Sequence, residues 1–260
     1  MTLTAHSPDG TYIAYDRSGH GPPLIIIGGA FNTRHTAAAL TPVLEPHFSV
    51  VQYDRRGRGD STEAGPWSAE REIEDLASLV DIAGGEAFVY GHSSGAIIAL
   101  EAAALGLPMT KLAAYEPPYT HTAHGGGSIA SWGDSIQAAL DAGDDQGATM
   151  LFLAGMGADD ATITGLQQLP WWPNMVALAH TLPYDVALLG NGAVPVDRFG
   201  DIRVPTLLLY GAESPDWAAD ATAVAENAIP TATQRRVEGQ DHNTDVAVIA
   251  PLLMQYFIED

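Results

Sequence analysis

The sequence predicts an α/β fold in which a mostly parallel sheet lies between layers of helices. Short apolar runs alternate with longer runs of helical periodicity in the first and last parts of the 260-residue chain. Such alternation is typical of parallel strands covered on both faces. Between residues 117 and 195 the alternation stops, and several helical runs follow one another. We therefore predict a core of residues 1–116 and 196–260 with an inserted helical cap at residues 117–195.

Turn signals and apolar runs predict the first elements. P-D-G at 8–10 marks a turn, and the weakly alternating residues 12–15 follow it as a hairpin strand. Residues 24–27 are wholly apolar, which is the pattern of a central strand. The next predicted strand covers 49–53, and the loop D-R-R-G-R-G-D-S at 54–61 follows it. We interpret this loop as a glycine-rich turn held by Asp–Arg pairs rather than as a phosphate site.

The next helix has clear start and stop signals. Ser68 can cap it, and Glu70 and Glu72 fall in its first turn, where negative charge suits the helix dipole. The glycines at 84–85 end it. Later in the chain we predict strands at 112–115, 204–210 and 233–237, and helices at 217–228 and 246–257.

The motif G-H-S-S-G at 91–95 lies between an apolar strand at 87–90 and an Ala-rich helical run. A strand, a sharp turn and a helix with serine at the apex form a nucleophile elbow. Gly91 and Gly95 fit there because bulkier side chains would collide in so tight a turn. The turn places the Ser93 hydroxyl above the sheet and near a helix N-terminus, which predicts that Ser93 is a nucleophile.

Residues that could form a site follow several predicted strands. Because sites in parallel sheets lie beyond the carboxyl ends of the strands, we expect these residues to converge. They are Ala30, Ser93, Glu116, Ser214 and His242.

A serine nucleophile needs a base, and the base needs a carboxylate that orients it. His242 is the histidine that follows the last predicted strand, and we predict that it is the base. Glu116 is the preferred acid, because it follows the strand after the elbow helix. Asp216 and Glu213 remain alternatives for the acid.

Aromatic side chains are candidates for the substrate pocket. His92 is expected to orient the elbow or to line the pocket, and Phe31 is expected to line it. Trp171 and Trp172 precede a proline in the cap and are predicted to form a wall for an apolar substrate. The alternative is that the apolar side chains of the cap only hold the cap together.

Composition limits the function classes. The formal net charge of −21 argues against nucleic-acid and membrane partners and favours neutral or cationic small molecules. The chain has no cysteine, which excludes a thiolate nucleophile and thiolate metal sites. We see no signal peptide and no bilayer-spanning apolar run, so we expect a cytoplasmic protein. The oligomeric state is left open between monomer and homodimer.

Four stretches together resemble the α/β-hydrolase superfamily along nearly the whole chain. They are I-G-G-A at 27–30, Y-D-R-R-G-R-G-D-S at 53–61, the elbow at 91–95 and G-Q-D-H at 239–242. The resemblance implies the α/β-hydrolase fold and an oxyanion hole. The hole would use the backbone N–H of Ser94 and one from Gly29 or Ala30, with Ala30 the first choice. The family's usual His-Gly is Gly-Gly here, so this choice stays open.

The acid departs from the family's usual pattern. The expected late aspartate position holds Ser214. A glutamate after the post-elbow strand is similar to the haloalkane dehalogenases and the fungal zearalenone lactonases, which supports Glu116. The lactonases also resemble this chain in S-S-G at the elbow and G-A-x-x-P at 211–215. Dehalogenases carry an aspartate nucleophile, and Ser93 rules out that chemistry.

The implied reaction is acyl transfer from an ester or lactone of a mainly apolar small molecule to water. It would proceed through an acyl-enzyme on Ser93 and require no metal or organic cofactor. Two alternatives use the same fold. One is a small-molecule receptor with little turnover, and the other is a non-hydrolytic biosynthetic enzyme, a cyclase or a perhydrolase.

Overall fold

The structure, a computed structural model, describes residues 2–120 and 126–259. Residues 121–125, which fall in the predicted cap, and the two terminal residues of the predicted core lie outside the described residues. The chain divides into two compact units. The core unit comprises Met1–Pro118 and Val194–Asp260, and the helical unit comprises Tyr119–Ala193.

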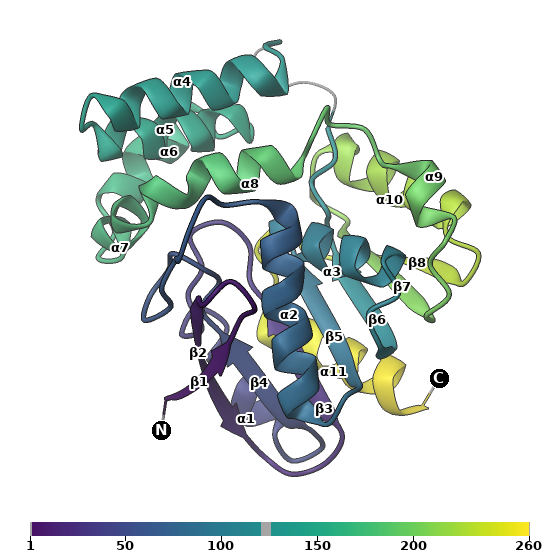
Figure 1. The fold of residues 1–260 in the computed structure, drawn as a ribbon. Coiled ribbons are helices and arrows are strands. Elements are labelled where there is room, and N and C mark those ends of the chain that lie inside the picture. The colour runs from purple at the N-terminus through teal and green to yellow at the C-terminus, as the bar shows by residue number, and fades with distance from the viewer. Residues whose placement is uncertain (1, 121–125, 260) are drawn as a thin grey trace. The chain divides into compact units, whose positions relative to one another are not determined.

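The described part of the core unit is built on an 8-stranded sheet with the order β1-β2-β4-β3-β5-β6-β7-β8 (Figure 1). Only the pairs β1–β2 and β2–β4 of this sheet are antiparallel. The predicted mostly parallel sheet is therefore confirmed. Its strands are β1 (Leu3–His6), β2 (Tyr12–Ser18), β3 (Pro23–Ile27), β4 (Ser49–Tyr53), β5 (Ala87–His92), β6 (Met109–Tyr115), β7 (Thr206–Gly211) and β8 (Ala232–Val237).

Burial explains the wholly apolar runs. Every residue of β4 is buried, as are residues 24–27 of β3, because helices cover both faces of these central strands. Figure 1 shows α2 and α3 in front of the sheet and α11 behind it. The helices of the core unit are α1 (Thr41–Leu44), α2 (Ala69–Ala83), α3 (Ser94–Ala104), α9 (Val196–Phe199), α10 (Asp216–Ala228) and α11 (Val246–Met254), with a π-helical turn at Gln255–Glu259.

Local signals place these elements well. Ser68 accepts a hydrogen bond from the N–H of Arg71, and α2 ends at Gly84, whose φ of 126° favours glycine. The hairpin turn at 8–10 is present, but it joins β2 to an additional strand, β1, which we did not predict. A four-residue edge strand contains too few positions for an alternating pattern to be visible.

The described part of the helical unit contains helices and no strand. Trp132 on α4 and Phe152 on α5 are both buried, with ring centroids 5.1 Å apart, and form part of the unit's own core. The Trp132 indole also donates to the Leu151 carbonyl at 2.9 Å. The helices are α4 (Ile129–Asp141), α5 (Asp145–Gly155), α6 (Asp160–Gln167), α7 (Trp172–Ala177) and α8 (Leu182–Leu188), with a 3₁₀ turn at Ala179–Thr181.

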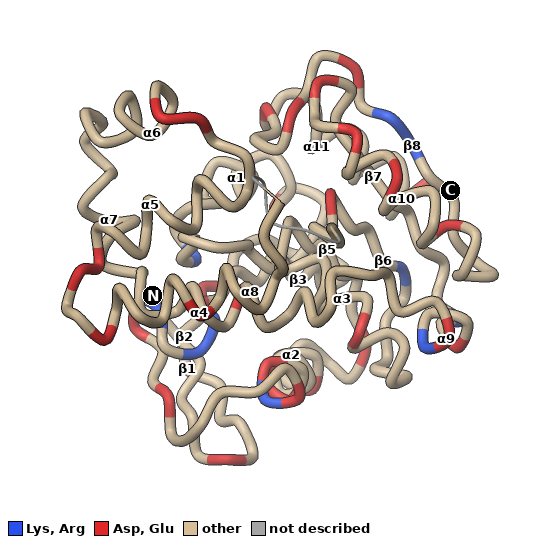
Figure 2. Tube along the Cα trace, turned by 90° about the horizontal axis from the view of Figure 1, so that it is seen from above, with Lys and Arg blue, Asp and Glu red and all other residues tan. Residues whose placement is uncertain are grey.

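Acidic residues are spread over the elements of both units, and Lys and Arg are few (Figure 2). The excess of acidic over basic residues gives the formal net charge of −21. Within the described residues, no helix combines the length and apolarity needed to cross a bilayer.

Candidate active site

Ser93 lies in the tight turn between β5 and α3, with φ 57° and ψ −127°. A Cβ added at Gly91 would lie 2.5 Å from the carbonyl oxygen of Gly95. A Cβ added at Gly95 would overlap the carbonyl oxygen of Ile27. Both positions therefore exclude a side chain, as the elbow motif predicts. Ser94 begins α3, so the serine hydroxyl lies at a helix N-terminus.

Strained backbone conformations mark three strand ends. Among the described residues, Phe31, Ser93 and Glu116 are the non-glycine residues with positive φ, at 59°, 57° and 46°. They follow β3, β5 and β6, which are neighbours in the sheet. Such conformations cost about 1–3 kcal/mol each and cluster at functional sites. The strain therefore coincides with the strand ends at which the sequence predicts the site.

Glu116 and His242 are in direct contact. His242 Nδ1 lies 2.6 Å from Glu116 Oε2, although the two residues are far apart in the sequence. The Glu116 side chain is 0% exposed, and its Oε1 also accepts from the Gly211 N–H at 2.7 Å and the Ser214 hydroxyl at 2.5 Å. Burial by itself raises the pKa of this carboxyl group, but the hydrogen bond and charge of His242 and the other two donors outweigh it and lower the pKa.

Ser214 occupies the position where the family usually has an aspartate, and it donates to Glu116 instead. Within the described residues, neither Asp216 nor Glu213 forms a hydrogen bond or ion pair with the His242 ring. Asp216 instead lies in the first turn of α10. Of the three candidate acids, only Glu116 contacts His242 among the described residues.

No hydrogen bond joins the Ser93 hydroxyl to His242 in the described part of the chain. The His242 ring does lie beside the elbow, with its centroid 4.9 Å from that of His92, the residue before Ser93. Catalytic hydrogen bonds of this kind are often long before substrate binds and shorten in the reacting complex.

His92 and Tyr115 hold the loop that carries His242. His92 Nε2 lies 2.8 Å from the His242 carbonyl oxygen, and the Tyr115 hydroxyl donates to the Asp241 carbonyl at 2.6 Å. The His92 and Tyr115 rings stack with centroids 5.7 Å apart. Burial, and then the neighbouring His242, lower the pKa of His92 to about 4, so the ring is neutral at pH 7. The sequence did not single out Tyr115, although its place directly before Glu116 was a usable signal.

Gly29 passes directly beside Ser93. A Cβ at this position would lie 2.7 Å from Ser93 Cβ and 3.2 Å from its Oγ. The adjoining peptide joins Gly29 to Ala30, the other candidate oxyanion donor. The structure therefore brings the predicted oxyanion loop to Ser93.

The remaining pocket candidates lie in different places. His92 lines a cavity of about 200 Å³ in the core unit, between the loop after β3 and the loop after β8. Phe31 follows β3 and is half-buried. Trp172 is buried, whereas Trp171 is 51% exposed, and both belong to the helical unit.

The arginine-rich loop after β4 is held by ion pairs with residues from outside the loop. Arg55 pairs with Glu72 at 2.7 Å and Arg56 with Asp75 at 2.8 Å, so both bind carboxylates of α2. Asp54 instead pairs with Arg34, from outside the loop. The predicted turn held by Asp–Arg pairs is therefore present, in the pairs of Arg56 with Asp75 and of Asp54 with Arg34. The partners come from other elements because all three arginine side chains of the loop point into the core unit.

Comparisons with known proteins find relatives in sequence and in fold. The chain is 28% identical over 240 residues to the 2-(acetamidomethylene)succinate hydrolase of Mesorhizobium japonicum, covering 86% of this chain and 82% of that one. An alpha/beta hydrolase from Sphaerobacter thermophilus superposes with a TM-score of 0.91 at 44% identity over 98% of this chain and 100% of that chain.

An enol-lactonase from Burkholderia xenovorans shares the fold, with a TM-score of 0.77 at 20% identity over 99% of this chain and all of that one (100%). Residues 24–251 match the sequence model of the Alpha/beta hydrolase family. With its elbow, its eight-stranded sheet and this match over most of its length, the chain belongs to the alpha/beta hydrolase family.

Proposed function

We propose that the protein is a carboxylic ester hydrolase, an esterase or lactonase, with Ser93 as nucleophile, His242 as base and Glu116 as acid. The contact between Glu116 and His242, 2.6 Å long, carries this proposal. It holds the Nδ1 edge of the imidazole and leaves the other ring nitrogen, Nε2, directed away from the buried carboxylate. The neighbouring elbow presents the hydroxyl that such a base would activate.

The reaction follows from these positions. The Ser93 oxygen attacks the ester or lactone carbonyl carbon, and its proton passes to Nε2 of His242. Glu116 remains ionised and stabilises the imidazolium through Nδ1–H. The C–O bond to the alcohol then breaks, and His242 returns the proton to that alcohol. Water, deprotonated by His242, attacks the acyl-enzyme and releases the acid and Ser93.

We assign substrate selection to the helical unit, acting as a cap, with Trp171 and Trp172 as pocket candidates. Because these two side chains are aromatic and largely apolar, we expect an apolar acyl or alcohol group. The resemblance of the elbow and the acid to zearalenone lactonases makes lactones the first class to test.

Amide hydrolysis is the second candidate. The Mesorhizobium japonicum relative, 28% identical, is named for a substrate that carries an acetamido group. The same three residues could transfer an acyl group from nitrogen, with His242 protonating the leaving amine. A substituted acetamide therefore belongs in the same panel as the esters and lactones.

The deciding experiment is a panel of p-nitrophenyl esters, lactones and acetamides assayed with the wild type and Ser93→Ala. We expect a p-nitrophenol burst that matches the enzyme concentration and is lost in Ser93→Ala. Ligand binding without a burst would favour the receptor alternative. Peroxide-dependent peracid formation that exceeds hydrolysis would favour a perhydrolase.

A further inference from the structure

Two buried arginines reach the oxyanion region from the loop after β4. The Nη1 of Arg58 donates to the Gly29 carbonyl at 2.6 Å, and the Nη1 of Arg55 donates to the Ser94 hydroxyl at 3.0 Å. Both arginine residues are 1% exposed. The loop therefore contacts the two chain segments that carry the candidate oxyanion donors.

The hydrogen bond from Arg58 to the Gly29 carbonyl determines the direction in which the N–H of Ala30 points. The described residues contain no cis peptide, so the N–H of Ala30 points opposite to the carbonyl of Gly29 in the same planar unit. Arg58 binds that carbonyl, and the Asn32 N–H also approaches it at 3.4 Å. The Ala30 N–H is thereby turned away from Arg58, while Gly29 lies against Ser93. This geometry favours Ala30 over Gly29 as the donor.

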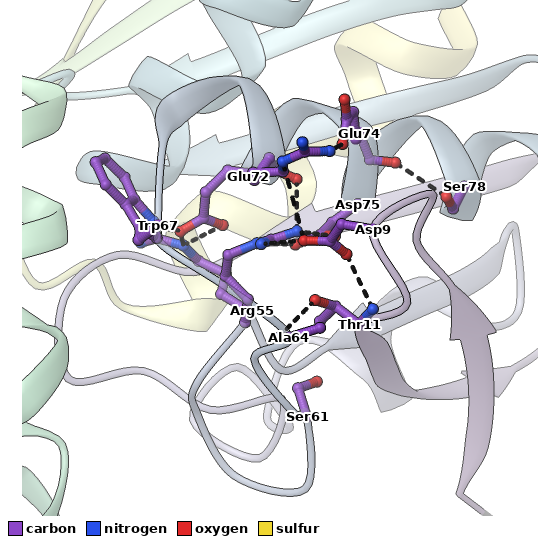
Figure 3. A network of polar contacts seen from close by, with 12 residues as sticks. Asp9, Thr11, Arg55, Ser61, Ala64, Trp67, Glu72, Glu74, Asp75 and Ser78 are labelled. Atoms are coloured by element: carbon purple, nitrogen blue, oxygen red, sulfur yellow. Dashed lines mark hydrogen bonds and ion pairs between the residues drawn. The ribbon is translucent and has the colours of Figure 1, made fainter.

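Arg55 is itself held rigidly. Its Nε and Nη2 donate to the Glu72 carboxylate at 2.7–3.2 Å, and the Trp67 indole donates to the same carboxylate at 3.1 Å (Figure 3). Glu72 belongs to α2, and Ser94 is the first residue of α3. The guanidinium thus links two helices at the point where the second oxyanion donor begins α3.

We propose that Arg58 and Arg55 are positioning residues for the oxyanion hole. Arg58 orients the N–H of Ala30 through the Gly29 carbonyl, and Arg55 holds Ser94 through its hydroxyl. Neither arginine touches the substrate. The inference rests on the proposed acyl-transfer function, since the two N–H groups act only when an oxyanion forms between them.

The test compares Arg58→Met with Arg56→Met. Arg56 is in the same loop and 0% exposed, but its guanidinium binds Asp75, Asp9 and the Arg71 carbonyl. Arg58→Met should lower kcat per titrated active site about 10- to 100-fold with KM nearly unchanged, because a displaced oxyanion donor weakens only transition-state binding. Arg56→Met should lower the melting temperature and leave kcat per titrated site unchanged.

Two further variants separate positioning from packing. Arg58→Lys, which keeps a cationic donor, should recover part of the loss seen in Arg58→Met. Ser94→Ala removes the Arg55 contact while it keeps the backbone N–H, and it should lower kcat about 3- to 10-fold, which is less than the loss of a whole donor. Equal kcat per titrated site in Arg58→Met and Arg56→Met would overturn the inference.

A readout that needs no turnover keeps the inference separate from the proposed function. A fluorophosphonate forms a tetrahedral adduct on an activated serine, so its labelling rate at Ser93 also depends on the oxyanion donors. A wild type that labels but hydrolyses nothing refutes the proposed function. In that case, slower labelling of Arg58→Met than of Arg56→Met still supports the inference, and equal rates refute it. A wild type that neither labels nor hydrolyses refutes both.

Discussion

The Glu116 carboxylate has the hydrogen-bond partners that an orienting acid would need. It is buried and accepts hydrogen bonds from His242, Ser214 and the Gly211 N–H. The residue at the usual acid position, Ser214, is one of these donors. A carboxylate with three donors stays ionised in a buried place because the hydrogen bonds favour its charged form.

Removal of this charge should disable the base. We expect Glu116→Gln to lower kcat about 10²- to 10⁴-fold, because an amide can stabilise the wrong imidazole tautomer and cannot stabilise the imidazolium. Asp216→Asn is the matched control and should retain nearly full activity. Steady-state kinetics normalised to active-site titration measures both variants. A larger loss in Asp216→Asn than in Glu116→Gln would move the acid to the loop after β7.

His92 should make stability depend on pH. Its pKa of about 4 in the folded protein is below the 6.5 of an unperturbed histidine, so the unfolded chain binds the proton more readily. This contribution is complete above pH 6.5 and is lost as the pH falls from 6.5 towards 4, by about 3 kcal/mol at most. Urea unfolding between pH 7.5 and 4.5 measures the loss.

His92→Gln supplies the control for that measurement. The glutamine amide can still donate to the His242 carbonyl but does not titrate. The wild type should therefore lose more unfolding free energy than His92→Gln as the pH falls from 7.5 to 4.5. Parallel curves for the two proteins would exclude His92 as the titrating group.

At the scale of elements, the loop after β3 and the elbow are packed against each other so closely that only glycine fits at position 29. Gly29→Ala would place a Cβ 2.7 Å from Ser93 Cβ. We expect it to lower kcat/KM at least about 100-fold, the scale of a lost oxyanion donor. Gly65→Ala has no atom within 4 Å of the added Cβ and should behave as wild type. Full activity in Gly29→Ala would contradict the close approach.

The loop after β4 is joined to α2 by buried ion pairs, and these should matter far more for stability than exposed ones. Arg56→Met leaves Asp75 buried without its partner, which typically costs about 3–5 kcal/mol. Arg198→Met removes a pair with Glu101 in which the arginine side chain is 62% exposed, worth about 1 kcal/mol or less. Chemical unfolding of both variants measures the contrast, and similar losses would contradict it.

For the whole molecule, the net charge of −21 should bias substrate encounter. We expect kcat/KM to be higher for a cationic ester than for an anionic ester of the same size, because the protein's field attracts one and repels the other. The ratio should fall as salt rises from about 0.01 M to 0.5 M, since the Debye length shrinks from about 30 Å to a few ångströms. A preference for the anionic ester at low salt would require a local cationic site.

Features that depend on neighbouring residues could be predicted from the sequence, whereas contacts between distant elements could not. Strands at 24–27 and 49–53, helix α2 and the elbow were predicted well because their signals lie within a few neighbouring residues. The partners of the arginines in the loop after β4 were not, because Glu72, Asp75 and Gly29 come from other elements.

The sequence by itself indicated most of the alternating strands and helices, although not β1, together with the serine at the elbow and the strand ends at which the candidate site residues lie. Periodicity, capping and glycine sterics act over a few residues, so they can be recognised in the amino-acid sequence. Only the tertiary structure decided that Glu116, 126 positions from His242, meets the imidazole and that Ser214, 98 positions from Glu116, donates to it. These contacts depend on strand order and register, which no local pattern of residues specifies.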